Sequence, residues 1–97
     1  MIKHIVCFKL KDNSLEKKLE AKKVLMSMEN NVDLIVSMNV GIDFLGSPRS
    51  YDVILEVILQ SKEDLEKYQN DSYHCNVVKK YMHEVRETSV SVDYVID

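Results

Sequence analysis

The segment Val53–Leu59, VILEVIL, is apolar at every position except Glu56. A short apolar run rich in β-branched residues is typical of a β-strand. Successive side chains of a strand lie on opposite faces, so Ile54 and Ile58 point away from the other apolar residues of this segment. The sheet that contains this strand therefore needs a cover on both faces, and this requirement limits the folds open to a short chain.

Apolar periodicity divides the rest of the sequence into strands and helices. Alternation of apolar and polar residues predicts strands, and apolar residues spaced three and four apart predict helices. Gly46 and Pro48 predict a turn that joins two neighbouring strands into a hairpin. The predicted elements, in chain order, are a strand over 2–10, a helix within 12–32, strands over 34–44 and 50–60, helices over 61–69 and 73–85, and a strand over 88–97.

Polar residues that favour helix starts place the boundaries of the helices. Asn13, with Glu16 three positions later, predicts the N-cap of the first helix. Ser61, with Asp64 three positions later, predicts the N-cap of the second. The polar residues 70–72 then separate the second helix from the third.

The element order βαββαβ predicts an α+β protein with the ferredoxin-like fold. In this fold a four-stranded antiparallel sheet carries its helices on one face, and 97 residues form a single domain over 1–97. The opposite face would then expose the apolar residues Ile5, Cys7, Ile54 and Ile58. A second copy of the same sheet would cover them, which predicts a homodimer. The alternative is a monomer with scattered apolar residues on its surface.

Composition argues against several classes of protein. A formal net charge of −3 disfavours nucleic acid as a partner, since its binders concentrate positive charge. No apolar run reaches the roughly 20 residues that span a bilayer, and the first residues lack the pattern of a signal peptide. We therefore expect a cytoplasmic protein without a membrane partner, in which Cys7 and Cys75 are reduced thiols.

Three residues are candidates for a functional site: His4, Tyr68 and His74. His4 shares a strand face with Val6 and Phe8, and all three candidates can face the space between helices and sheet. A histidine can act as a general acid or base near neutral pH, and a tyrosine hydroxyl can donate a hydrogen bond to a developing enolate oxygen. The alternative is that each is a hydrogen-bonded core residue without a role in chemistry.

Patterns for a metal or a nucleotide cofactor are absent from the sequence. His74 and His83 are nine positions apart, which would place them on opposite sides of a regular helix. No Gly-rich loop precedes a helix. We therefore expect His83 on the surface and neither a cofactor nor a metal ion. Cys75 is adjacent to His74, but neighbouring helical side chains point in different directions, which disfavours a Cys–His nucleophile.

Several stretches taken together resemble one known family. IKHIVCFKL, VGID, SYDVILEV, LEKYQNDSYHCNV and SVDY, in this order along the chain, are similar to the stress-responsive α/β-barrel domain family, known as Dabb. The resemblance implies a ferredoxin-like protomer whose sheet pairs with that of a second protomer to form a dimeric α/β barrel. Plant polyketide cyclases of this family use a His and Tyr pair for an aldol-type ring closure without a cofactor. The positions that they use resemble Tyr68 and His74, with His4 also in the pocket.

The sequence departs from the pattern of the family at two places. Asp71 and Ser72 stand where family members usually have His-Pro, and Val53 stands where the cyclases have a further pocket histidine. We expect a homodimer of unassigned activity that binds a small molecule in a pocket near the three candidate residues. The alternative is a cofactor-independent enzyme, polyketide cyclase-like or monooxygenase-like, that transfers protons on a small carbonyl compound.

Overall fold

The computed structural model describes residues 1–96 and confirms the predicted βαββαβ order. Asp97, the last residue of the predicted final strand, lies outside the described residues. Within residues 1–96, the helices are too short or too polar to cross a lipid bilayer. The elements are β1 (Ile2–Leu10), α1 (Leu15–Met26), the 3₁₀ helix η1 (Ser27–Asn30), β2 (Ser37–Ile42), β3 (Val53–Leu59), α2 (Lys62–Gln69), the π-helix η2 (His74–Lys79), α3 (Lys80–Val85) and β4 (Arg86–Val95).

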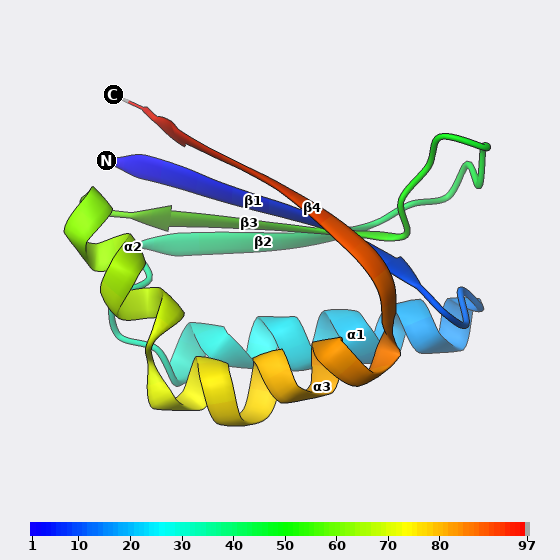
Figure 1. The fold of residues 1–97 in the computed structure, drawn as a ribbon, viewed down its shortest axis with the longest axis horizontal. Helices are drawn as coiled ribbons and strands as arrows, with labels where there is room; N and C mark the ends of the chain where they lie inside the picture. The colour runs from blue at the N-terminus through cyan, green and yellow to red at the C-terminus, as the bar shows by residue number, and fades with distance from the viewer. Residues whose placement is uncertain (97) are drawn as a thin grey trace.

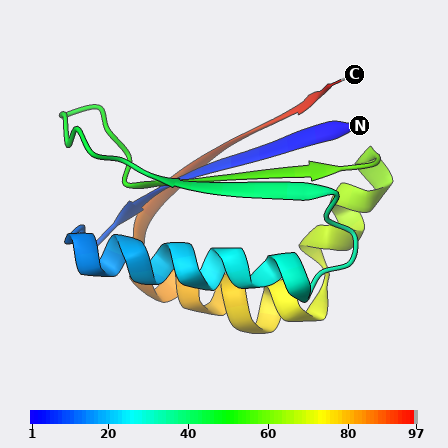
Figure 2. The ribbon, with the colours of Figure 1, turned by 180° about the vertical axis from the view of Figure 1, so that it is seen from behind.

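The strands form one antiparallel sheet in the order β2-β3-β1-β4, so the structure has the predicted ferredoxin-like fold. α1 and α3 lie along one face of the sheet, and α2 lies at one end of it (Figure 1). The view from behind shows the same arrangement, with the opposite face of the sheet free of helices within the described chain (Figure 2). The two ends of the chain are adjacent, since the backbone N–H of Ile96 donates to the carbonyl oxygen of Met1 at 2.9 Å.

Apolar side chains between the sheet and the helices form the core. β3 places alternate residues there, and α1, η2 and α3 supply the facing side chains. Burial of each large apolar side chain stabilises the fold by roughly 1.5–3 kcal/mol. The largest fully buried side chains are those of Tyr68, Leu25, Met28, Leu59, Val32, Val53, Val57 and Val78.

β4 carries polar side chains toward the helices and apolar side chains away from them. Ser89, Ser91 and Asp93 pair with Phe8, Val6 and His4 of β1, and these β1 side chains face the helices. The outward residues of β4 are Val90, Val92 and Tyr94, and they are between 44 and 60 % exposed. This polarity is the reverse of that expected for a strand of a monomeric two-layer protein.

The outward side of β4 continues the apolar face predicted from β1 and β3. We call this surface the outer patch, and its residues are Ile5, Cys7, Ile54, Ile58, Val90, Val92 and Tyr94. The first four are partly exposed, as the alternation of their strands predicts. Burial raises the pKa of the Cys7 thiol, with a smaller contribution from the charge of Glu56.

Helix starts follow the predicted chemistry, with one correction. The N-cap of α1 is Ser14 and not Asn13, because the Ser14 hydroxyl accepts from the backbone N–H of Lys17 at 3.3 Å. Asp12 explains the choice, since its carboxylate accepts from the backbone N–H of Ser14 at 3.0 Å and orients it. The predicted cap at Ser61 is confirmed, with its hydroxyl 3.1 Å from the backbone nitrogen of Asp64.

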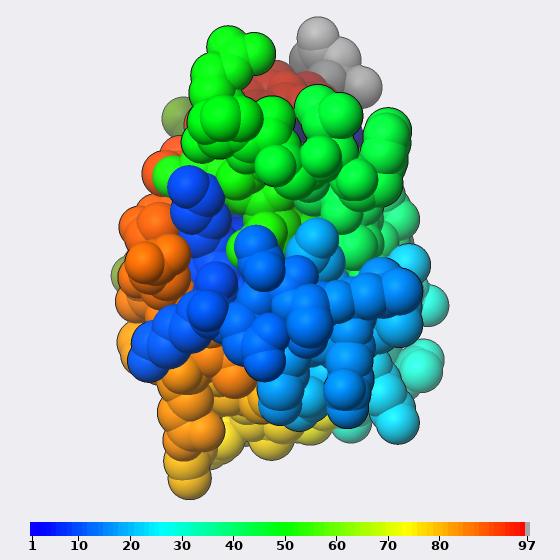
Figure 3. Space-filling model, turned by 90° about the vertical axis from the view of Figure 1, so that its right-hand side faces the viewer, coloured from blue at the N-terminus to red at the C-terminus, as the bar shows by residue number. Residues whose placement is uncertain are grey.

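β2 ends earlier and β3 begins later than predicted because the chain leaves the sheet after Ile42, and β2 also begins at Ser37 instead of residue 34. The carboxylate of Asp43 accepts from the backbone N–H of Gly46 at 2.7 Å, which turns the chain. Gly46 has φ of 64°, a conformation that favours glycine. Phe44 was predicted to continue the strand but is 96 % exposed. Figure 3 views the molecule from the end that carries this loop, residues 43 to 52, and the loop lies in the upper part of the picture.

The last helical segment is continuous from residue 72 to Val85, but it is not a regular α-helix. Residues His74–Lys79 form η2, a π-helical stretch, before α3 begins at Lys80. A π-helical stretch inserts an extra residue into the turn, which moves every later side chain back by about 100° around the axis. The helix therefore presents a different face to the sheet after η2 than a regular helix would present.

Candidate functional site

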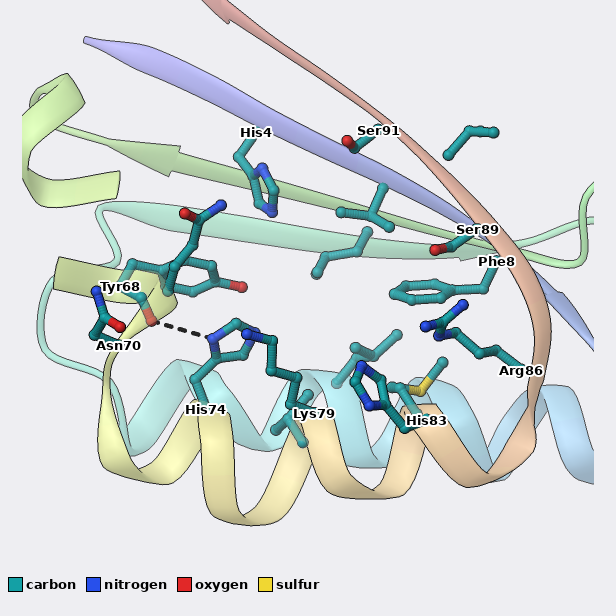
Figure 4. A pocket seen from close by; sticks show the side chains of 17 residues that line it. His4, Phe8, Tyr68, Asn70, His74, Lys79, His83, Arg86, Ser89 and Ser91 are labelled. Atoms are coloured by element: carbon teal, nitrogen blue, oxygen red, sulfur yellow. Dashed lines mark hydrogen bonds between the residues drawn. The ribbon is translucent and has the colours of Figure 1, made fainter. Parts of the chain in front are cut away.

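A cavity of about 510 Å³ lies between the sheet and the last helical segment. Its lining contains Tyr68 and all three histidines of the chain, His4, His74 and His83. His4 points into the cavity from β1, whereas His74 and His83 point into it from the helical side (Figure 4). Small-molecule sites usually occupy about 300–1,000 Å³, so the volume suits a small ligand.

His4 is held by a carboxylate at the far edge of the sheet. Its Nδ1 contacts the Oδ1 of Asp93, which is directly opposite on β4. A carboxylate accepts hydrogen bonds, so Nδ1 is the donor, and Nε2 remains for other contacts. The side chain of His4 is 8 % exposed and that of Asp93 is 38 % exposed. Asp93 therefore supplies the hydrogen-bond partner that the buried imidazole of His4 requires.

Tyr68 occupies the centre of the site. Its ring lies between the two histidine rings, with its centroid 5.6 Å from that of His4 and 4.4 Å from that of His74. Its hydroxyl donates to the sulfur of Met28 at 3.6 Å. A thioether is a weak acceptor, so this hydroxyl can donate to a stronger acceptor in the cavity. Burial raises the pKa of Tyr68, and the charge of Asp71 adds to the shift, so the hydroxyl keeps its proton.

The imidazole of His74 is oriented by the backbone. Its Nδ1 lies 3.1 Å from the carbonyl oxygen of Tyr68, and because a carbonyl can only accept, Nδ1 carries the proton. Burial is the main cause that lowers the pKa of His74, and the nearby Lys79 lowers it further. At neutral pH the ring is therefore uncharged, and its Nε2 has a free lone pair that can accept a proton.

The departure from the family pattern at Asp71 contributes to this placement. The carboxylate of Asp71 accepts from the backbone N–H of His74 at 3.0 Å, and its carbonyl oxygen accepts from the N–H of Cys75 at 2.9 Å. An aspartate that accepts from the third residue of a helix acts as its N-cap. Asp71 thus begins the last helical segment and fixes the position of His74.

His83 lies on the surface as predicted, but the prediction of its side of the helix is wrong. It was expected on the opposite side of the helix from His74, but both residues line the cavity. The reason is η2, which lies between them: nine residues of regular helix give about 180°, and the inserted residue reduces this to about 80°. His83 is exposed as well as lining the cavity.

Polar residues that the sequence analysis did not select complete the lining. Ser89 and Ser91 enter from β4. Lys79, the last residue of η2, and Arg86, the first residue of β4, enter from either side of α3. Asp93 could have been found from its position opposite His4, but only if the register of β1 and β4 were known. The sequence has no local motif for any of these residues.

The three predicted site residues, His4, Tyr68 and His74, are brought together as expected. Cys75 is not among the residues that line the cavity, and its thiol donates to the carbonyl oxygen of Gln69 at 3.3 Å. Within residues 1–96, no group of three or more His, Cys, Asp or Glu side chains is arranged to hold a metal ion. The arrangement can supply a proton acceptor at His74 and a hydrogen-bond donor at Tyr68.

Sequence comparison identifies the family. The sequence model of the Stress Responsive A/B Barrel Domain, Dabb, matches residues 2–96. The four-stranded antiparallel sheet of this chain, with its helices on one face, agrees with that match. The chain therefore belongs to the Dabb family. A comparison with curated protein sequences gives no match at a significant level.

Solved structures share the fold over nearly the whole chain. A dimeric ferredoxin-like protein of unknown function from Bacteroides fragilis is 26 % identical, with a TM-score of 0.79 over 98 % of this chain and 95 % of that one. A Dabb family protein from Mesorhizobium loti is 24 % identical, with a TM-score of 0.74 over 98 % and 95 %. Hydroxynitrile lyase from Passiflora edulis is 16 % identical, with a TM-score of 0.77 over 99 % and 93 %.

Proposed function

We propose that this protein is a cytoplasmic homodimer, with one Dabb-type domain over 1–97, that binds a small molecule in the cavity between helices and sheet. The observation that carries the proposal is the reversed polarity of β4. Its residues Ser89 and Ser91 line the cavity and Asp93 contacts His4, whereas its outward residues are apolar and exposed. Polar groups facing inward suit a site that holds water or ligand, and apolar groups facing outward suit a protein interface.

The outer patch supports the homodimer. It extends over three neighbouring strands, and none of the described helices covers it. Contiguous exposed apolar surface of this kind marks an interaction site, and the same sheet face on two copies can pair about a two-fold axis. The similar protein from Bacteroides fragilis is described as dimeric.

The groups around the cavity support small-molecule binding. Tyr68 is fully buried and His4 is 6 % exposed, yet within residues 1–96 the hydroxyl of Tyr68 has only a thioether as its partner. The Nε2 of His74 remains available after Nδ1 bonds to the backbone. Such incompletely paired polar groups beside an apolar lining are typical of a ligand site.

A thermal-shift screen of a metabolite library tests this proposal, because a ligand that binds only the folded state raises its melting temperature. Compounds that stabilise the wild type are then measured against Ser91→Leu, which fills the cavity from β4. Ser72→Leu is the matched control, since Ser72 is exposed and outside the lining. We expect binding to disappear in Ser91→Leu and to persist in Ser72→Leu. Equal binding to both variants would refute a site in this cavity.

A second candidate function is proton transfer on a small carbonyl compound without a cofactor. The observation that favours it is the stacking of the His74 and Tyr68 rings, with centroids 4.4 Å apart, at a place where burial lowers the pKa of His74. His74 would accept a proton from the carbon next to the carbonyl, and Tyr68 would donate a hydrogen bond to the resulting enolate oxygen. The His4–Asp93 pair would stabilise charge at the opposite side of the Tyr68 ring.

Deuterium exchange separates this activity from binding alone. A bound ketone is incubated with the protein in D₂O, and the loss of its α-proton signal is followed by NMR. General base catalysis typically contributes about 10²–10⁴-fold, so His74→Gln should reduce the exchange rate by a factor in that range while ligand binding persists. Exchange that is no faster with wild type than with His74→Gln would leave the protein as a binding protein.

A further inference from the structure

The charged side chains that line the cavity are opposite in sign to the net charge of the chain. The chain has 16 acidic and 13 basic residues and a formal net charge of −3. The lining contains two permanent cations, Lys79 and Arg86, and no aspartate or glutamate among the described residues. The nearest carboxylates, those of Asp93 and Asp71, are held by His4 and by the backbone N–H of His74. Cationic side chains that line a cavity attract anionic groups to it.

The cationic side chains are not used in ion pairs within the structure. The ion pairs found in residues 1–96 join Lys3 to Glu56, His4 to Asp93 and Lys17 to Glu20. None of them involves Lys79 or Arg86. In Figure 4 the side chains of Lys79, His83 and Arg86 all extend into the cavity from its helical side and from the start of β4.

The remaining walls are apolar, so the site has two chemically different parts. Val6 and Leu55 of the sheet face Val78 and Met82 of the helical segment across the cavity. A ligand that fills the cavity must therefore combine an apolar body with a group that suits Lys79 and Arg86. A carboxylate meets that requirement, because guanidinium and ammonium groups form charge-assisted hydrogen bonds with it.

We propose that the ligand of this cavity is a small organic acid, with its carboxylate between Lys79 and Arg86 and its apolar body against the walls. This inference rests on the proposed function, since it specifies the class of ligand for the same cavity. Because Lys79 is near His74, the Nε2 of His74 and the hydroxyl of Tyr68 are then available to a carbonyl group near the carboxylate of the ligand.

Paired compounds test the charge requirement directly. A panel of aromatic and aliphatic carboxylic acids is compared with the corresponding primary amides, which match the acids in shape but carry no charge. Binding is measured by isothermal titration at low ionic strength. We expect the acids to bind at least about tenfold more tightly than their amides, since charge-assisted hydrogen bonds are stronger than neutral ones.

Charge variants locate the effect. Lys79→Gln and Arg86→Gln should each weaken acid binding about fivefold and leave amide binding unchanged. Lys80→Gln is the matched control, because Lys80 is exposed, adjacent in sequence and outside the lining. Wild-type protein provides a test that needs no variant: raising NaCl from about 0.05 to 0.5 M should weaken the binding of acids only, because salt screens charges near the surface.

Each result leads to one conclusion. Acids that bind more tightly than amides, with a loss in Lys79→Gln and Arg86→Gln, support the inference. Amides that bind as tightly as acids, or acids that bind equally to wild type and both variants, overturn it but leave the small-molecule site intact. If no member of the panel binds at millimolar concentration, and the metabolite screen also finds no ligand, the proposed function fails together with the inference.

Discussion

The contact between His4 and Asp93 should contribute measurably to stability. Asp93→Asn keeps an oxygen that can accept from Nδ1 of His4, so only the charge of the acceptor is lost. Hydrogen bonds to charged groups contribute about 1.5–3 kcal/mol and neutral ones about 0.5–1.5 kcal/mol, a difference of about 1 kcal/mol. The Asp93 side chain is 38 % exposed, so solvent screens its charge. We therefore expect Asp93→Asn to lower the free energy of unfolding by no more than about 1 kcal/mol.

Removal of the acceptor should cost more than removal of its charge. Asp93→Ala leaves the Nδ1–H of His4 without a partner in a side chain that is 8 % exposed. An unpaired buried polar group destabilises the folded state by about 1–3 kcal/mol. We therefore expect the free energy of unfolding to decrease in the order wild type, Asp93→Asn, Asp93→Ala.

Urea unfolding at pH 7 measures these differences, at one fixed protein concentration because the stability of a dimer depends on it. In thermal unfolding, a loss of 1 kcal/mol lowers the melting temperature of a domain of this size by about 4–8 °C. Asp33→Asn is the matched control, since Asp33 is exposed. A double-mutant cycle with His4→Gln isolates the pairwise contribution. The reasoning is wrong if the two substitutions are additive, or if Asp93→Ala is as stable as the control.

Three further predictions concern the outer patch and the site. Ile58→Asp should give monomers or aggregates in analytical ultracentrifugation, whereas Leu19→Asp, on an exposed position of α1, should not; a monomeric wild type at micromolar concentration would contradict this. Tyr68→Phe should lower the free energy of unfolding by less than about 1 kcal/mol, because it removes one hydrogen bond to a weak acceptor and keeps the ring; a larger loss in urea unfolding would mean that the hydroxyl has a stronger partner. Because its folded-state pKa is lowered, His74 should make the protein less stable as pH falls below about 6.5, where the unfolded chain binds the proton more strongly; unfolding curves of His74→Gln should lack this part of the pH dependence.

Local sequence patterns determined the elements and the two-sided character of the sheet. The alternation in Val53–Leu59 requires that Ile54 and Ile58 face away from the helices, whatever the topology. Ser61 caps α2 as predicted because the interaction joins residues three positions apart. The error at Asn13 has the same local origin: Asn13 and Ser14 are both good N-caps, and the contact of Asp12 with Ser14 decides between them.

The candidate residues His4, Tyr68 and His74 could be selected from the sequence because each lies on an apolar face or beside a helix boundary. The packing of helices on the sheet then places their rings together, with Tyr68 between the two histidines. The fold class was sufficient for this part of the site, since all three side chains point into the same layer.

The rest of the site depends on geometry that no local pattern encodes. Asp93 reaches His4 only through the register between β1 and β4, which joins residues 89 positions apart. His83 reaches the cavity only because η2 changes the phase of the helix after His74. A strand register and a π-helical insertion are both set by packing across the whole layer, since a shift of one residue in either would move every later side chain to another face.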